Sequence, residues 1–196
     1  MKEPDTHLHY KIYKPVGMLS QFHSNDTKES RKKRFLTDIH TFPDNLMPIG
    51  RLDEKSEGLL VLTTDGKLSD TINRAGIEKQ YVAQLDGLIT EEAITLLQNG
   101  VTIGIHGKKY ITKSCSVEMI TTPKVVPAHT SLRIGRHRPT SWISITITEG
   151  KFRQIRKMTA AVGFPTVRLI RVRIGTISLD NMQPGEFQQL STPLCY

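Results

Sequence analysis

Arg51 and Asp53 stand two positions apart in the stretch "MPIGRLDEKSEGLLVLTTDG" (residues 47–66), shortly before an apolar run from Leu59 to Leu62. An aspartate at the entrance to a buried strand most often caps a turn or a helix. A carboxylate held in place beside a cation is also what nucleophilic or general-base chemistry requires. The pair therefore marks Asp53 as a candidate catalytic residue, with a purely structural cap as the alternative.

Further residues with chemical potential lie later in the chain. Tyr81, in "EKQYVAQ", offers a flat ring on which a nucleobase could stack, although a core tyrosine with a satisfied hydroxyl fits the same pattern. A basic group occupies "KFRQIRKMTAAVG" (residues 151–163), and consists of Lys151, Arg153, Arg156 and Lys157. A second basic group, in the proline-containing stretch 121–140, consists of Arg133, Arg136 and Arg138, which either bind RNA or belong to a solvated loop.

The composition limits what these residues can be doing. The chain has 196 residues, with 27 Lys+Arg against 19 Asp+Glu, and a net charge of +8. Such an excess favours a polyanionic partner, namely RNA, DNA or an acidic membrane surface. No apolar run approaches the ~20 residues of a membrane span. The start "MKEPDTHLHY" carries no signal sequence, so a cytoplasmic protein is expected.

The cysteines argue against a disulfide framework and against a zinc site. There are only two, Cys115 and Cys195, without C-x-x-C spacing. We therefore expect no structural metal and a reducing environment.

Hydropathy patterns predict the elements that position these residues. Strands are expected at 10–14, 59–62, 79–87, 143–148 and 166–175, with further strand-like segments between the second helix and Met119, and helices at 65–76, 90–100 and 151–163. Residues 25–35 are expected to form an exposed connection. In the last helix the spacing places Phe152 on the apolar side with Ile155 and Met158. Strands outnumber helices and do not alternate regularly with them, which predicts an α+β fold with a largely antiparallel sheet.

Three segments together resemble a known family. "GRLDEKSEGLLVLTTDG" is similar to the signature of the pseudouridine synthases of the RsuA/RluB/RluE/RluF group, "EKQYVAQLDG" to the group's second motif, and "EGKFRQIRKMTAAVGFPTVRLIRVRIG" to its third. The resemblance implies the pseudouridine synthase catalytic fold: a mixed, mostly antiparallel sheet flanked by a few helices, with the active-site cleft across the sheet. It implies one domain over residues 1–196, made of two sub-halves that share the sheet.

The resemblance also implies a role for each matching residue. Asp53 corresponds to the catalytic aspartate and Tyr81 to the tyrosine that stacks on the target uracil. Arg156 corresponds to the basic residue that pairs with the aspartate, and Arg51 to an arginine that helps to hold the RNA. The reaction implied is isomerisation of uridine to pseudouridine, with neither metal nor organic cofactor. Lys151, Arg153 and Lys157 are then expected to bind RNA.

The layout of the chain points to a substrate within this family. "HYKIYKPVGML" resembles the first catalytic strand and begins within ten residues of Met1, which leaves no room for an N-terminal S4-type RNA-binding module. This compact arrangement, together with "RPTSWISITITEG" and "GFPTVRLIRVRIGTISLDNMQPGEF", most resembles the members of the group that act on the large ribosomal subunit, and the resemblance implies action on one uridine of 23S ribosomal RNA. A monomer is the default expectation. The alternatives are a synthase acting on small-subunit ribosomal RNA or transfer RNA, and a non-catalytic RNA-binding protein of the same fold.

Overall fold

The computed structural model describes residues 7–74, 76–123 and 139–190, which fall into two compact units. Unit 1 is built from Met1–Ile77 together with Thr176–Tyr196, and unit 2 from Glu78–Gly175. The chain therefore leaves unit 1, completes unit 2, and returns to unit 1 with its last segment.

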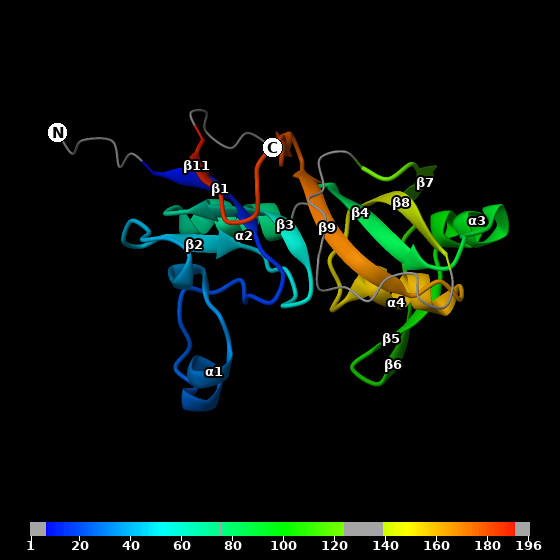
Figure 1. Ribbon diagram of the computed structural model, residues 1–196, viewed down its shortest axis with the longest axis horizontal. Coiled ribbons are helices and arrows are strands. Elements are labelled where there is room, and N and C mark those ends of the chain that lie inside the picture. The colour runs from blue at the N-terminus through cyan, green and yellow to red at the C-terminus, as the bar shows by residue number, and fades with distance from the viewer. Residues whose placement is uncertain (1–6, 75, 124–138, 191–196) are drawn as a thin grey trace. The chain divides into compact units, whose positions relative to one another are not determined.

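The sheet of unit 1 is antiparallel and centred on a fully buried strand. Its strands are β1 (His9–Lys14), β2 (Met47–Ile49), β3 (Glu57–Thr63) and β11 (Phe187–Gln189), while β10 (Ile177–Ser178) also belongs to this unit. Strand β1 lies between β11 and β3, and the short β2 pairs with β3 (Figure 1). All seven residues of β3 are buried, which confirms the strand predicted at 59–62.

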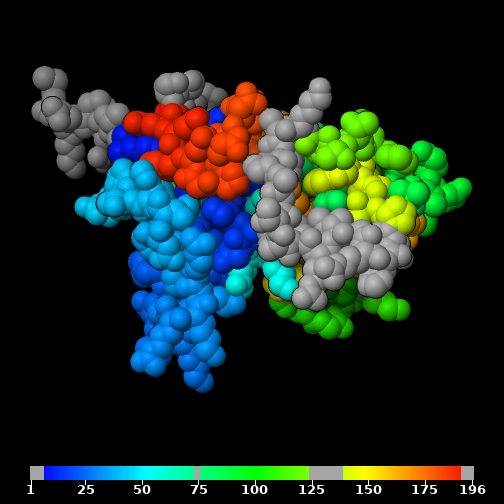
Figure 2. All heavy atoms as spheres, viewed as in Figure 1, coloured from blue at the N-terminus to red at the C-terminus, as the bar shows by residue number. Residues whose placement is uncertain are grey.

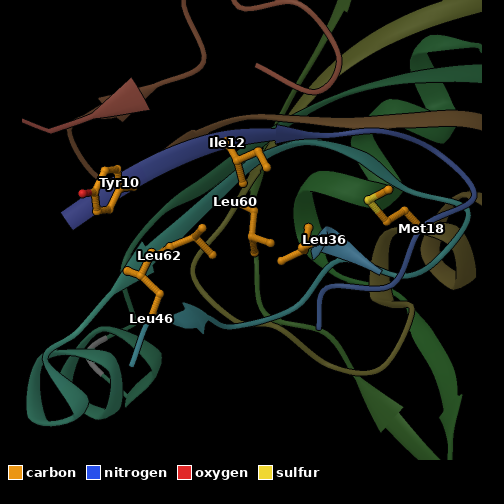
Figure 3. Close-up of a cluster of buried hydrophobic side chains, with 7 residues drawn as sticks. All are labelled: Tyr10, Ile12, Met18, Leu36, Leu46, Leu60 and Leu62. Atoms are coloured by element: carbon orange, nitrogen blue, oxygen red, sulfur yellow. The ribbon is translucent and has the colours of Figure 1, made fainter. Parts of the chain in front are cut away.

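The core of unit 1 packs side chains from these strands against the loops that follow β1. Figure 3 shows the cluster, whose buried members are Tyr10, Ile12, Met18, Leu36, Leu46, Leu60 and Leu62. The ring of Phe187 from β11 stacks on Tyr10 with centroids 4.5 Å apart. The return of the chain into unit 1 is thus fixed by hydrophobic packing as well as by strand pairing.

Unit 1 also contains a helix that the hydropathy pattern did not predict. Residues 25–35 were expected to be an exposed connection, yet they contain α1 (Thr27–Lys32), followed by the 3₁₀ helix η1 (Leu36–Asp38). Asp26 caps α1 by accepting hydrogen bonds from the N–H groups of Lys28 and Glu29. No residue of α1 is buried, and the helix lies at the surface in Figure 2. Its sequence therefore has no apolar periodicity from which the helix could be predicted. The predicted helix at 65–76 is present as α2 (Gly66–Arg74).

The described residues of unit 2 form a four-stranded antiparallel sheet and a separate hairpin. The strand order is β9 (Thr166–Ile174), β4 (Lys79–Asp86), β8 (Thr140–Ile147) and β7 (Ser116–Ile120). The hairpin consists of β5 (Thr102–Ile105) and β6 (Lys108–Ile111). Every strand pair named here is antiparallel, in agreement with the predicted α+β class.

Two helices complete unit 2, and one begins later than predicted. Helix α3 (Glu91–Asn99) is capped by Thr90 and ends at Gly100, as the sequence indicates. Helix α4 (Gln154–Ala161) buries Ile155 and Met158, but it starts only after Arg153, whose backbone is left-handed at φ 52°. Phe152 therefore precedes the helix and is 58% exposed, so its predicted place on the apolar side was wrong.

Candidate active site

The loop that leads into β3 carries the candidate catalytic residue. Arg51 is exposed, Leu52 is buried and Asp53 is partly buried. The carbonyl of Asp53 accepts a hydrogen bond of 2.9 Å from the N–H of Ser56, which closes a tight turn. The residue thus lies where a buried strand begins, with its position set by the turn.

A second segment of unit 1 anchors this loop on both sides of Asp53. The buried Ser20 hydroxyl donates to the carbonyl of Leu52 at 3.0 Å and accepts from the Leu52 N–H at 2.9 Å. The N–H of Gly17 donates to the carbonyl of Glu54 at 2.8 Å. The residues before and after Asp53 are therefore both attached to the segment that follows β1.

A buried lysine shapes that anchoring segment in turn. Lys14 is fully buried, and its ammonium group donates to the carbonyls of Pro15 at 2.9 Å and Met18 at 2.6 Å. Hydrogen bonds of this kind offset the cost of burying a charge. Lys14 and Ser20 were not predicted as site residues, because each acts on backbone groups that no sequence pattern marks.

Tyr81 occupies an irregular position in the sheet of unit 2. Its residue is 8% exposed and lies in β4, opposite Ile145 of β8 and Arg171 of β9. The pairing with β9 shifts register between Gln80 and Tyr81. Such irregularities redirect a side chain and are frequent beside active sites. Burial, with repulsion from Arg171, lowers the pKa of the nearby Lys79.

The basic residues predicted at 151–157 come together around the start of α4. Arg156 is partly buried, and one of its contacts is a hydrogen bond of 3.2 Å from Nη1 to the carbonyl of Thr166 in β9. Lys151 and Arg153 are exposed, and the ammonium group of Lys157 donates to the carbonyl of Gly104 in β5 at 2.7 Å. The remaining predicted group, Arg133, Arg136 and Arg138, lies outside the described residues.

A network of hydrogen bonds to one carboxylate, that of Glu149, fixes the turn that precedes α4. Glu149 accepts hydrogen bonds from the Tyr110 hydroxyl at 2.5 Å and from the Lys113 N–H at 2.9 Å. Gln154 Nε2 donates to the same carboxylate at 2.6 Å. Burial raises the pKa of Glu149, but these hydrogen bonds and the charge of Lys151 outweigh it and lower the pKa below its usual value. The hydrogen bond to Glu149 correspondingly raises the pKa of Tyr110.

Neither a metal centre nor a membrane span is found in the part of the chain that the structure describes. The described side chains form no group of three or more histidine, cysteine, aspartate or glutamate residues that could hold a metal ion. None of the described helices is long and apolar enough to cross a membrane.

Comparison with known proteins identifies the family. The sequence profile described as RNA pseudouridylate synthase matches residues 9–161. The chain belongs to this family. The match spans Asp53, Tyr81 and Arg156, and membership makes the chain an enzyme that isomerises uridine to pseudouridine in RNA.

Relatives and solved structures agree with this assignment. The "Ribosomal large subunit pseudouridine synthase E" of Xanthomonas axonopodis is 39% identical over 88% of each chain. The protein of that name from Vibrio parahaemolyticus is 37% identical over 90% of this chain and 71% of its own. A solved structure titled "Crystal structure of pseudouridylate synthase" superimposes with a TM-score of 0.75 at 26% identity, covering 96% of this chain and 72% of that one. The fold predicted from the resemblance, a mostly antiparallel sheet with a few helices, is confirmed.

Proposed function

We propose that this pseudouridylate synthase modifies one uridine of the large-subunit (23S) ribosomal RNA, during ribosome biogenesis and in the cytoplasm. The choice of large-subunit RNA as the substrate rests on similarity, over most of both chains, to relatives named for the large ribosomal subunit. The net charge of +8 supports a polyanionic partner. The enzyme acts as a monomer in this proposal, and light scattering of the purified protein tests that part.

The proposal assigns the chemistry to Asp53. The reaction breaks the N-glycosidic bond of the uridine and rejoins the sugar to C5 of the uracil. It requires one positioned carboxylate, and the double attachment of Leu52 to Ser20 holds the Asp53 backbone in place. Whether the carboxylate attacks the sugar or removes a proton from it, the loop must keep Asp53 fixed while the base turns.

The remaining residues bind and orient the RNA in this proposal. A uridine in folded RNA reaches the carboxylate only when it is flipped out of its stack, at a cost of about a few kcal/mol. Stacking on the ring of Tyr81 offsets roughly 1–3 kcal/mol of that cost. Arg156 stabilises the charge of Asp53, and Arg51 holds the backbone around the flipped nucleotide. Lys151, Arg153 and Lys157 bind neighbouring phosphates.

Pseudouridine mapping tests both substrate and catalytic residue. Ribosomal and transfer RNA from cells that lack the protein is compared with RNA from cells complemented by wild type or by Asp53→Asn. We expect one pseudouridine to be missing from large-subunit RNA and to return only with wild type. Return with Asp53→Asn would show that the aspartate is structural, and a loss confined to small-subunit or transfer RNA would refute the substrate.

A further inference from the structure

The turn of the β5–β6 hairpin and the residue preceding α4 bring two exposed aromatic rings together. His106 is exposed at the hairpin turn, and Phe152 is 58% exposed. Their ring centroids lie 6.1 Å apart with planes inclined by 24°. Figure 1 shows the hairpin beside α4 within unit 2. Two nearly parallel rings are therefore presented to solvent from segments far apart in the sequence.

Unusual backbone conformations hold both rings at the surface. His106 has φ 47° and is followed by Gly107 at φ 78°, so both residues of the two-residue turn are left-handed. That turn usually carries Asn-Gly, and a histidine in its first position is uncommon. Arg153 has φ 52°, and this turns Phe152 away from the apolar face of α4. The left-handed backbone of Arg153, outside any such turn, is strained, and strain of this kind is concentrated at functional sites.

One cation lies over the Phe152 ring, and others belong to the segments that carry the two rings. The ammonium group of Lys157 lies 4.9 Å from the centroid of the Phe152 ring and is hydrogen-bonded to Gly104 of the hairpin. The ammonium group of Lys151 lies 5.0 Å from the ring of Tyr110 on the second hairpin strand. Lys108 and Lys109, next to the turn, and Arg153 are all exposed. Flat rings among positive charges are the combination that binds unpaired nucleotides, with bases on the rings and phosphates on the cations.

We propose that His106 and Phe152 form an aromatic platform on which an unpaired base of the RNA substrate, other than the uridine being modified, stacks. The ligand is single-stranded or loop RNA, because a base inside a duplex is already stacked on its neighbours. The proposal rests on RNA being the substrate, and it adds a contact that none of the predicted site residues makes. Phe152 is the principal member, since its ring has the larger apolar face.

Binding of two RNA probes measures the platform directly. The probes are a fluorescein-labelled twelve-nucleotide oligoadenylate and a twelve-base-pair RNA duplex, titrated by fluorescence anisotropy at one salt concentration. We expect Phe152→Ala to weaken oligoadenylate binding about tenfold and to leave duplex binding unchanged. Phe152→Tyr should bind as wild type does, whereas Phe152→Leu, which keeps apolar bulk without the ring, should bind as the alanine variant does.

A matched control and a second signal separate stacking from loss of structure. Leu96→Ala removes another exposed apolar side chain of unit 2, on α3, and should leave both affinities unchanged. In Phe152→Trp the new indole should be quenched by oligoadenylate, whereas the native Trp142 is buried. Unchanged oligoadenylate affinity in Phe152→Ala, or equal losses on both probes, would overturn the platform.

The outcome is independent of the test of the proposed function. Pseudouridine formation by wild type with normal oligoadenylate binding by Phe152→Ala would refute only the platform. Oligoadenylate binding that depends on Phe152, with no pseudouridine lost from large-subunit RNA in the deletion strain, would refute only the substrate.

Discussion

Ser20 shows how a single side chain can support a catalytic residue that it does not touch. Its hydroxyl bonds the N–H and the carbonyl of Leu52, the residue before Asp53, from a position 32 residues earlier in the chain. Resemblance to the family assigned Asp53, because the motif around it is contiguous. No contiguous motif links Ser20 to Leu52, so only the folded chain reveals the pair.

Ser20→Ala should therefore impair both stability and catalysis. The substitution leaves the buried N–H and carbonyl of Leu52 without the hydroxyl, which costs about 1–3 kcal/mol in the free energy of unfolding. A loosened loop misplaces Asp53, and we expect kcat for pseudouridine formation to fall at least tenfold. Urea unfolding and single-turnover assays on large-subunit RNA measure the two effects.

Ser30→Ala is the control for that comparison. Its hydroxyl donates to the carbonyl of Ser24 at 2.8 Å on the exposed α1, where water can replace it. The control should change the free energy of unfolding by less than about 0.5 kcal/mol. Equal effects of the two substitutions would show that Ser20 has no special part in holding the loop.

Helix and strand prediction from the sequence succeeded where local signals and burial agree. Strand β3 is an apolar run, and α3 has both an N-cap at Thr90 and a terminating glycine at Gly100. It failed at α1, which buries nothing, and at the start of α4, where a left-handed Arg153 delays the helix. That conformation depends on tertiary contacts such as the Glu149 network, so periodicity alone placed Phe152 on the wrong side.

The same network predicts how the stability of unit 2 depends on pH. The pKa of Glu149 is lowered in the folded chain, so its stabilising effect is complete above the unfolded value of about 4.3 and is lost as the pH falls through the folded value. Glu149→Gln should lower the free energy of unfolding by about 1–2 kcal/mol at pH 7. The difference from wild type should begin to shrink as the pH falls below the unfolded value of about 4.3, and it should be lost once the pH falls through the lowered folded value, where the wild-type carboxyl also becomes neutral.

Urea unfolding at several pH values measures that difference. Glu118→Gln, an exposed substitution on β7, is the control and should change the free energy of unfolding by less than about 0.5 kcal/mol. If Glu149→Gln lowers the free energy of unfolding by the same amount at pH 7 and at pH 3.5, the effect comes from the shape of the side chain and not from its charge.

For the whole molecule, the net charge of +8 predicts RNA binding without saying where the RNA lies. Charge counts cannot distinguish a binding surface from a solvated one, and we compare two exposed basic groups from the described part of the chain as candidates for the role. One is Arg31 and Lys32 in the last turn of α1, and the other is Lys151 and Arg153 before α4. The second group includes Arg153, next to the exposed Phe152, and Lys151, over the ring of Tyr110, which favours it as the contact with phosphate.

The salt dependence of RNA binding decides between these two groups. Each phosphate contact contributes about 0.7–0.9 to the slope of log K against log salt concentration. Lys151→Gln combined with Arg153→Gln should therefore reduce the slope by about 1.5, whereas Arg31→Gln combined with Lys32→Gln, which removes the same charge, should leave it unchanged. The measurement is anisotropy with a large-subunit RNA fragment between 50 and 200 mM salt. If only the α1 variant has a smaller slope, the phosphate contacts lie on α1 in unit 1. Both variants lose the same net charge, so a difference between them must come from where the charges lie.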